Sequence, residues 1–435
     1  MLTVLLLAGA LVAAWALFAR VLGRWHVMGP LAMAIGGAAA GIFITDKVGF
    51  GLFLNSNAAE RIAELVLALV LFVDATEVRL GAMKAVRGPV LRLLFIALPI
   101  SMFLAWMFAS VLLPDLSLAV TLAIACIIVP VDFSPVTSIV KDTSIPQRLR
   151  HILNLESGYN DGIITPLFLF ALALAGDAKR GGPGASLGQA IPAFLIAVAV
   201  GLVVGVAYAV LANASGRRGW FSAQSMRIGL VAVPLLTYAL AVTLHGNGFI
   251  AAFVAGTVFR MLRRTRELHE ELSLAEDISI INNMVLWFVL GATVIFIGQV
   301  LETIWPTLLL AALALTVIRM GPVLLSLLGT ALPGRERLLI ATLGPRGTAS
   351  VVFGVLAFNA IDDIDSAALV LAVTVFMLGG SVLLHSLGTQ PLLRVLVPSA
   401  KRGIVLGRPL PRRKSPSPRA LTGAWAQLPN LHLPR

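Results

Sequence analysis

The chain has 435 residues, of which 58% are hydrophobic and 12% are charged, and its mean hydropathy is +0.95. This balance excludes an ordinary soluble globular protein. The net charge of +12 could suit a nucleic-acid-binding protein, but the Lys and Arg residues stand in short breaks between apolar stretches, so we expect no nucleic-acid partner. Cys126 is the only cysteine, which excludes an intramolecular disulfide and cysteine-rich metal centres.

The apolar stretches determine the predicted fold. Segments of roughly 20 apolar residues, each long enough to cross a bilayer, follow one another from residue 1 to about residue 397. Dividing them at Gly, Pro and charge clusters predicts an all-α polytopic membrane protein with about thirteen transmembrane helices. We expect one transmembrane domain over residues 1–398 and a basic, disordered tail rich in Pro, Ser and Arg over residues 399–435.

The distribution of basic residues predicts the orientation of these helices. Connections rich in Lys and Arg, such as residues 148–150 and 260–266, alternate with acidic or neutral ones, such as residues 46–60 and 361–365. Basic connections stay on the cytoplasmic side of a membrane. The pattern therefore predicts a cytoplasmic C-terminus and an N-terminus on the opposite side.

Asp74 lies near the end of an early apolar stretch, in the segment "LFVDATEVRL". Its position close to Arg79 fits a structural acid at a helix end. A carboxylate inside a membrane helix fits an ion or proton pathway equally well. Both roles of Asp74 stay open at this point.

The stretch "LAIACIIVPVDFSPVTSIV" contains Asp132 between Pro130 and Pro135. A proline inside a helix removes a backbone hydrogen bond, so Pro135 frees the carbonyl oxygen of Val131. Unwound backbone persists in a membrane only where it is buried in protein or lines a cavity. A carboxylate beside carbonyl oxygens suits a desolvated monovalent cation. The alternative is a proline kink in which Asp132 makes a structural hydrogen bond.

The next stretch, "RLRHILNLESGYNDGIITPLFLF", carries a group of polar residues inside its basic start. Ser157 and Asp161 are four residues apart and share a helix face, whereas Glu156 lies on a neighbouring stripe with Asn160. We expect Asp161 to serve an ion or proton pathway, because an unpaired carboxylate in a membrane is costly. For Glu156 we expect a structural salt bridge.

A second interrupted stretch, "LLIATLGPRGTASVVFGVLAF", surrounds Arg346 with Gly344, Pro345 and Gly347. The guanidinium lies where two half-helices should meet, and its charge needs a partner. We predict that this partner is Glu156. Arg319 is expected to interact near the cytoplasmic end of its own helix, with an accessory role in the core left open. With about thirteen helices the two broken ones are the fifth and twelfth, and they run in opposite directions, as in inverted repeats.

Several of these segments resemble the monovalent cation/proton antiporters, in the branch that includes bacterial and animal sodium/proton exchangers. Residues 156–162 resemble the "ESLLNDG" signature of that branch, and Asp132 stands at the aspartate of its "TDP" motif. Residues 344–350 are similar to its "GPRG" segment, and residues 71–80 to its "LFxxGLEL" segment. The order and approximate spacing agree, and the resemblance covers the chain before the tail.

The resemblance implies a role for each matched residue. Asp161 would bind the cation and the proton in turn, and the metal ligands for a monovalent cation would be Asp161 and Asp132. The other residues of the implied cation/proton site are Ser157, Asn160 and a carbonyl near Val131, with Glu156 and Arg346 as the structural ion pair. The family fold also implies a homodimer. Val131 replaces the usual threonine, and a proline follows Asp132 by three residues instead of one, so Na⁺, K⁺ and Li⁺ all stay candidates.

Two other classes of protein could also carry buried acids. A cation channel would explain them, but it does not need two opposed broken helices with a compensating arginine. An intramembrane aspartyl enzyme could use Asp132 and Asp161, but neither aspartate stands in a recognisable protease motif, and the chain lacks an "HExxH" motif. The sequence therefore predicts a multi-pass antiporter of the bacterial inner membrane that needs no cofactor, is not an enzyme, and exchanges one cation for one proton.

Overall fold

The computed structural model describes residues 2–25, 27–43, 56–77, 80–133, 136, 145–177, 183–265, 267–300 and 304–396. Within these ranges every regular element is a helix, which confirms the predicted all-α class. The predicted tail at residues 399–435 and the second proline of the first break, Pro135, lie outside the described residues.

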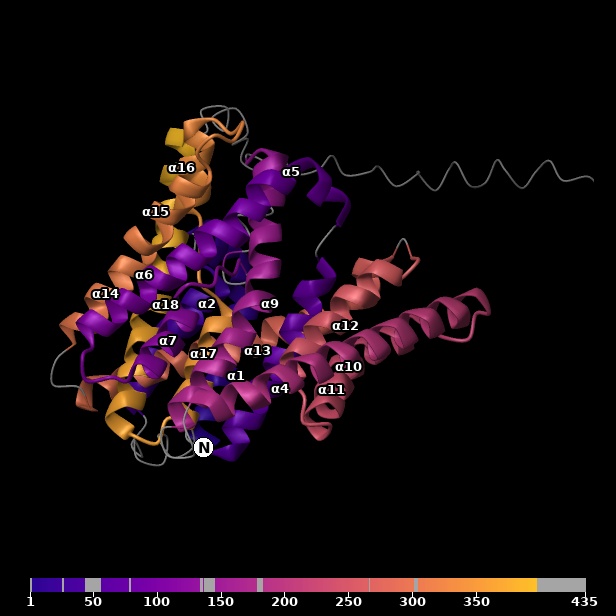
Figure 1. Cartoon of the computed structure of the whole chain (residues 1–435), viewed down its shortest axis with the longest axis horizontal. Helices are drawn as coiled ribbons and strands as arrows, with labels where there is room; N and C mark the ends of the chain where they lie inside the picture. The colour runs from indigo at the N-terminus through magenta and orange to yellow at the C-terminus, as the bar shows by residue number, and fades with distance from the viewer. Residues whose placement is uncertain are drawn as a thin grey trace, which may run out of the picture.

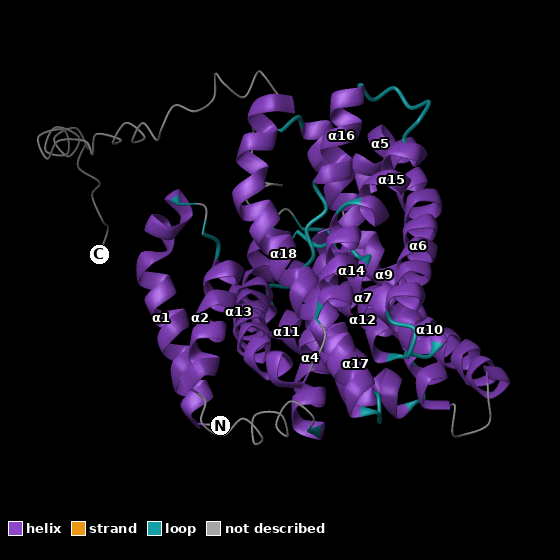
Figure 2. Ribbon diagram, turned by 90° about the vertical axis from the view of Figure 1, so that its left-hand side faces the viewer, coloured by secondary structure: helices purple, strands orange, loops and turns teal. Residues whose placement is uncertain are grey.

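The helices follow one another along the chain and are labelled in Figures 1 and 2. Their bounds are α1 (Leu2–Arg24), α2 (Gly29–Phe43), α4 (Asn57–Glu77), α5 (Leu80–Arg92), the π-helix η1 (Leu93–Ala97), α6 (Leu98–Leu112), α7 (Leu118–Ile128), α9 (Gln147–Asp177), α10 (Pro183–Arg217), α11 (Ala223–Thr243), α12 (Gly248–Leu262), α13 (Leu268–Val300), α14 (Trp305–Leu315), α15 (Val317–Ser326), α16 (Gly334–Thr342), α17 (Thr348–Ala360) and α18 (Ile364–Leu396). In the described part of the chain, eight helical segments are long and apolar enough to cross a bilayer. The number of about thirteen helices and the orientation of the termini stay predictions.

The packing of the helices divides them into two groups. In one group α13 packs along α2, and α12 packs against α4, α10 and α11. In the other group α18 packs against α14 and α17, and α7 packs against α6 and α9. The groups meet where α17 contacts α4 and α13. Figure 1 shows α10, α11 and α12 together at one side of the molecule, away from α14, α15 and α16.

Small residues allow the closest of these approaches. A Cβ atom added to Gly205 of α10 would lie 2.8 Å from the carbonyl oxygen of Ala255 on α12. A Cβ atom on Gly201, one turn earlier, would lie 2.6 Å from the carbonyl oxygen of Ala251. Lipid supplies no hydrophobic force between membrane helices, so close backbone contact of this kind stabilises their association.

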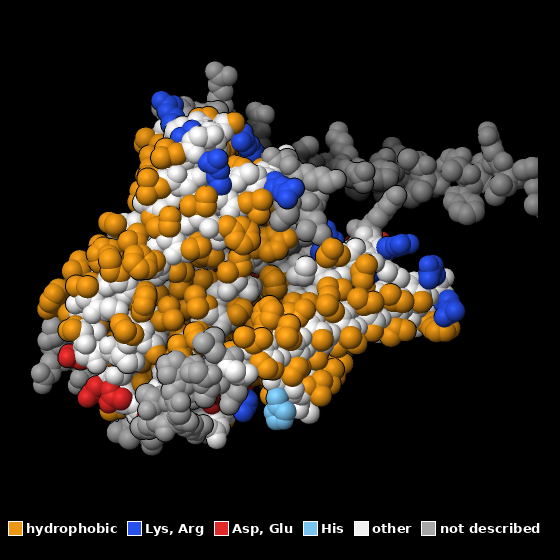
Figure 3. All heavy atoms as spheres, viewed as in Figure 1, with side chains coloured by type: hydrophobic (Ala, Val, Ile, Leu, Met, Phe, Trp, Pro, Cys, Tyr) orange, Lys and Arg blue, Asp and Glu red, His pale blue; other side chains and the backbone are white. Residues whose placement is uncertain are grey.

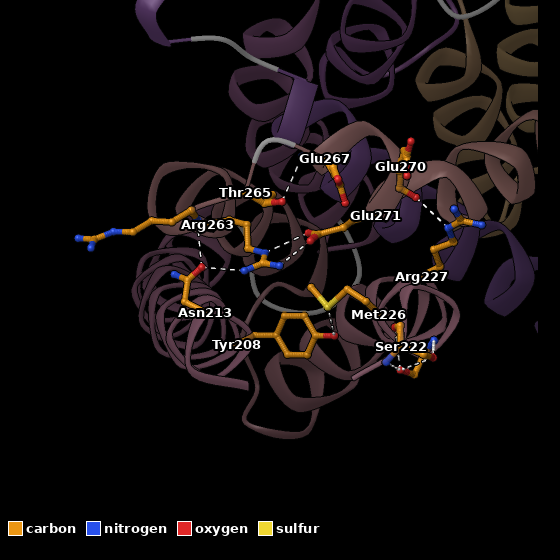
Figure 4. A network of polar contacts seen from close by, with 12 residues as sticks. Tyr208, Asn213, Ser222, Met226, Arg227, Arg263, Thr265, Glu267, Glu270 and Glu271 are labelled. Atoms are coloured by element: carbon orange, nitrogen blue, oxygen red, sulfur yellow. Dashed lines mark hydrogen bonds and ion pairs between the residues drawn. The ribbon is translucent and has the colours of Figure 1, made fainter. Parts of the chain in front are cut away.

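Polar contacts tie the ends of the α10–α13 group together (Figure 4). Arg263, after α12, donates to the Glu271 carboxylate of α13 at 3.0 and 2.5 Å. It also donates to Asn213 Oδ1 of α10 at 2.8 Å. Arg227 of α11 donates to the carbonyl oxygen of Glu270 at 3.0 Å. Four helices are therefore fixed to one another at this end.

The surface suits a lipid environment. Apolar side chains cover most of the face seen in Figure 3, and many large ones, such as Leu202, Val203 and Leu211 on α10, are exposed. Lys and Arg side chains gather towards the end of the molecule at which α5 and α16 lie and at the tip of α10, whereas Asp and Glu side chains appear near the opposite end. On this face an apolar belt thus lies between an end rich in Lys and Arg and an opposite end at which Asp and Glu side chains appear.

Two helical runs are interrupted where the sequence predicts. Helix α7 ends at Ile128, and residues 129–133, which include Pro130 and Asp132, are not helical. The second run stops at Thr342, and residues 343–347 are not helical until α17 begins at Thr348. Prolines at both places explain the interruptions, because proline cannot supply the backbone donor that continues a helix.

Candidate functional site

The two interruptions lie against each other and are joined through their backbones. The amide of Asp132 donates to the carbonyl oxygen of Pro345 at 2.9 Å. The hydroxyl of Ser350, in the first turn of α17, donates to the carbonyl oxygen of Ile127 in the last turn of α7, at 2.7 Å. These bonds place the end of α7 beside the beginning of α17, near the middle of the second helix group.

Asp132 caps the start of α17. Its Oδ2 accepts a hydrogen bond from the amide of Thr348 at 2.7 Å, and the side chain is buried. The first amides of a helix have no partner within the helix, and this end carries a partial positive charge, so a carboxylate there is stabilising. A side chain at Gly347 would collide with the Asp132 carboxylate, which explains the glycine. Asp132 therefore has a structural role, and its role as a cation ligand stays a proposal.

Arg346 places a positive charge at the C-terminal end of α7, as Asp132 places a negative charge at the N-terminal end of α17. Its Nε donates to the carbonyl oxygen of Ile128, the last residue of α7, at 2.8 Å. The guanidinium also donates to the carbonyl oxygens of Gly344, at 3.1 Å, and Ala314, at 3.5 Å. A buried positive charge thus stands at the partially negative end of α7. Each broken run supplies the charge that stabilises the helix end of the other.

The predicted ion pair between Glu156 and Arg346 is wrong. Glu156 pairs instead with Arg319 of α15: Nη1 donates to Oε1, and Nη2 donates to Oε2 at 2.9 Å. Both side chains are buried. The carbonyl oxygens of Ile128, Gly344 and Ala314 already solvate Arg346. Apart from Glu156, Arg319 donates among the described residues only to the carbonyl oxygen of Ile340, at 3.3 Å. A buried arginine in a membrane helix needs an acid, so the sequence marks Arg319 as a candidate partner of Glu156 beside Arg346 but does not choose between the two.

Asp161 and Asn160 lie on α9 and are almost fully buried, with 3% and 2% of their surface exposed. Among the described residues, neither Asp161 Oδ1 nor Asn160 Oδ1 has a hydrogen-bond partner. Asp161 also interacts electrostatically with the carboxylate of Asp132. A buried carboxylate oxygen without a donor is costly, so this site requires a proton or a cation to neutralise it.

The remaining predicted site residues are less closely defined. Ser157 is half-buried on α9, and Val131 is fully buried in an apolar cluster with Phe133 and Ile152. Asp74 is half-buried on α4, the helix that packs against both α9 and α17. Their roles in binding stay predictions.

The chain is similar to known proteins over almost its whole length. Residues 5–395 match the family described as "Sodium/hydrogen exchanger, transmembrane". A Na(+)/H(+) antiporter, NhaH, from Halobacillus dabanensis is 28% identical over 307 residues, which are 66% of this chain and 71% of that protein. A K(+)/H(+) antiporter, NhaP2, from Shewanella sp. (strain MR-4) is 27% identical over 320 residues, 72% of this chain, and this match spans 54% of the relative.

The fold also has a known counterpart. The structure of the sodium proton antiporter MjNhaP1 from Methanocaldococcus jannaschii at pH 8 superposes with a TM-score of 0.74 and 20% sequence identity. The match covers 91% of this chain and 99% of that one. The arrangement of helices described above is therefore that of a known membrane fold.

Proposed function

This chain belongs to the sodium/hydrogen exchanger family, and from this premise we propose that it exchanges a monovalent cation for H⁺ at a site centred on Asp161. The observation that carries the proposal is the pair of buried oxygens without donors, Asp161 Oδ1 and Asn160 Oδ1. They lie on α9, in the helix group that contains both interruptions.

The chemistry follows from what a buried carboxylate can hold. Protonation neutralises Asp161, and so does a bound cation, but one carboxylate does not hold both at once. Oxygen ligands suit hard monovalent cations, and the candidates beside Asp161 are the side chains of Asp132, Ser157 and Asn160 and the carbonyl oxygen of Val131. The family is one of transporters, so these residues bind and release ions and do not catalyse a covalent reaction.

We propose Na⁺ as the transported cation. The family description and the Halobacillus relative both name sodium, whereas the Shewanella relative is named a K(+)/H(+) antiporter. Because Val131 brings no hydroxyl to the site, the side chains alone do not select between Na⁺, K⁺ and Li⁺.

The chain is a multi-pass membrane protein, as the eight apolar spans of the described residues and the transmembrane family indicate. We propose the inner membrane of a bacterium and a homodimer. The basic end of the molecule in Figure 3 supports placing α5, α16 and the tip of α10 on the cytoplasmic side. The transmembrane domain would then span residues 1–398, with the tail at residues 399–435 in the cytoplasm.

Proton flux in proteoliposomes tests the proposal, with Na⁺, K⁺ and Li⁺ added in turn to vesicles that contain a pH-sensitive dye. The parent protein should release protons from acidified vesicles on addition of its cation, and Asp161→Asn should abolish this flux. Asp115→Asn is the matched control, because Asp115 is exposed in the turn between α6 and α7. Normal exchange by a folded Asp161→Asn protein would contradict the assignment.

A further inference from the structure

Helix α18 presents two buried polar side chains to the interruption between α16 and α17. Ser381 and His385 are four residues apart, so they share one face of the helix. Ser381 is fully buried, and His385 is 4% exposed. Neither residue belongs to the sequence motifs that identify the ion site.

Both side chains accept hydrogen bonds from the unwound backbone. Ser381 Oγ accepts from the amide of Arg346 at 2.9 Å, and His385 Nε2 accepts from the amide of Gly344 at 3.3 Å. Amides in an interrupted helix have lost their usual acceptors, and a buried amide without an acceptor is costly. The Gly344 amide also donates to the carbonyl oxygen of Thr342 at 3.2 Å. Helix α18 therefore supplies the acceptor of the Arg346 amide and a second acceptor for the Gly344 amide.

The contacts of the His385 ring determine where its proton lies. Nδ1 is 2.7 Å from the carbonyl oxygen of Ser381, and this contact is a hydrogen bond only if Nδ1 carries the proton. A neutral ring then has a bare Nε2 that can accept from Gly344. Protonation of Nε2 would reverse its role, because it would donate to the carbonyl oxygen of Thr342, 3.2 Å away, and lose the bond from Gly344.

Burial and the neighbouring charges favour the neutral ring. Burial disfavours a charged ring at His385, and the nearby guanidinium groups of Arg346 and Arg319 add to this effect. The neutral form is also the form that the bond from the Gly344 amide requires.

Two further contacts connect Gly344 to the proposed ion site. Pro345 follows Gly344 in the chain, and its carbonyl oxygen accepts from the amide of Asp132 at 2.9 Å. Asp132 in turn interacts electrostatically with Asp161. Residues 344–346 therefore contact the backbone of Asp132 directly.

We propose that neutral His385 is a positioning residue for ion exchange, which holds the backbone of Gly344 so that Asp132 lies at the correct distance from Asp161. The inference rests on the proposed cation/proton exchange at Asp161. The neutral imidazole acts as a fixed acceptor, and its titration takes no part in the transport cycle.

Two substitutions at position 385 separate the hydrogen-bond acceptor of the side chain from its ability to titrate. His385→Gln keeps an acceptor that does not titrate, whereas His385→Leu removes the acceptor and keeps an apolar side chain. His385→Leu should raise the apparent KM for Na⁺ roughly three- to tenfold, the effect of losing one hydrogen bond, with a smaller change in kcat. His385→Gln should restore the parent KM and keep the parent pH profile.

A matched control lies next in the chain. Ser386 is buried on α18, and its Oγ has no hydrogen-bond partner among the described residues, so Ser386→Ala should keep the parent KM. Melting in detergent and elution on a sizing column establish that each variant is folded. If His385→Leu does not fold, Ser381→Ala takes its place, since it removes the acceptor of the Arg346 amide and should raise the KM in the same direction.

Three results would overturn the inference: a parent-like KM in a folded variant that lacks the acceptor, a His385→Gln protein as defective as His385→Leu, or a shifted pH profile in His385→Gln. Amide hydrogen exchange at residues 343–348 provides a readout that does not depend on transport. It should be faster in His385→Leu and parent-like in His385→Gln, and equal rates in all three proteins would also overturn the inference. Absence of exchange by the parent protein would instead contradict the proposed function.

Discussion

Glu156 and Arg319 are 163 residues apart in the chain and form a buried, two-fold hydrogen-bonded ion pair. Removing one partner should leave an uncompensated charge inside the protein, at a cost of about 3–5 kcal/mol. We expect Glu156→Gln and Arg319→Met each to lower the free energy of unfolding by this amount. The double substitution should be less destabilising than the sum of the two. Thermal unfolding in detergent measures all three.

An exposed ion pair provides the comparison. Arg61 and Glu64 are 2.7 Å apart on α4, and the Arg61 side chain is 64% exposed. A surface pair of this kind contributes about 0–1 kcal/mol, so Arg61→Met should unfold close to the parent temperature. Equal melting of the parent, Glu156→Gln and Arg319→Met would show that the buried pair is not a stabilising element.

The sequence predicts the residues of the site better than their partners. Asp161 and Asn160 could be predicted as candidates because polar groups in an apolar stretch are rare and costly, which is a property of each residue alone, and the structure shows both side chains buried. The partner of Glu156 could not be identified in this way, because Arg319 and Arg346 both need compensation. The choice depends on the carbonyl oxygen of Ile128, which reaches Arg346 only in the folded protein.

At the scale of elements, the contact between α7 and α17 gives Asp132 two properties that substitution can separate. Asp132→Asn keeps an oxygen that can accept from the Thr348 amide but removes the charge, whereas Asp132→Ala removes both. Loss of such a cap costs about 0.5–2 kcal/mol. We expect Asp132→Ala to melt at a lower temperature than Asp132→Asn, and both to bind Na⁺ more weakly in the flux assay. Parent-like Na⁺ affinity in Asp132→Asn would assign Asp132 to the capping role alone.

A second prediction concerns the close backbone contact between α10 and α12. Gly205→Ala should destabilise the protein by about 1–3 kcal/mol, because the added methyl group forces the two backbones apart. Gly188 lies on the same helix with open space around it, so Gly188→Ala is the control and should leave the melting temperature unchanged or raise it. A parent-like melting temperature for Gly205→Ala would contradict the close contact.

Local chemistry predicts where the helices are interrupted, but not how the interruptions pair. Pro130 and Pro345 mark the two breaks directly, since a proline has the same effect on a helix in any fold. The pairing of the breaks follows from bonds between residues about 200 positions apart, such as Ser350 to Ile127. The π-helix at Leu93–Ala97 leaves no such mark in the sequence.

For the whole molecule, the single acid of the Asn160–Asp161 pair predicts electroneutral exchange of one cation for one proton. Protons fill Asp161 at low pH and the cation fills it at high pH, so transport should slow at both extremes. The apparent affinity for the cation should fall as the pH is lowered. Cation-driven proton flux in vesicles clamped at several membrane potentials tests the stoichiometry. A reversal point that moves with voltage would show net charge movement and would give Asp132 a role in carrying protons.

Helix α10 is too long for the membrane that it crosses. Its 35 residues extend over roughly 52 Å at about 1.5 Å per residue, whereas the hydrocarbon core of a bilayer is about 30 Å thick. The helix therefore either lies obliquely or extends beyond the hydrocarbon core, and in Figure 1 it runs obliquely to the side of the molecule. It packs closely against α12, α12 packs against α4, and α4 packs against α9 and α17. We therefore expect the transport rate to depend on the thickness of the surrounding bilayer, because a thinner or thicker membrane favours a different tilt.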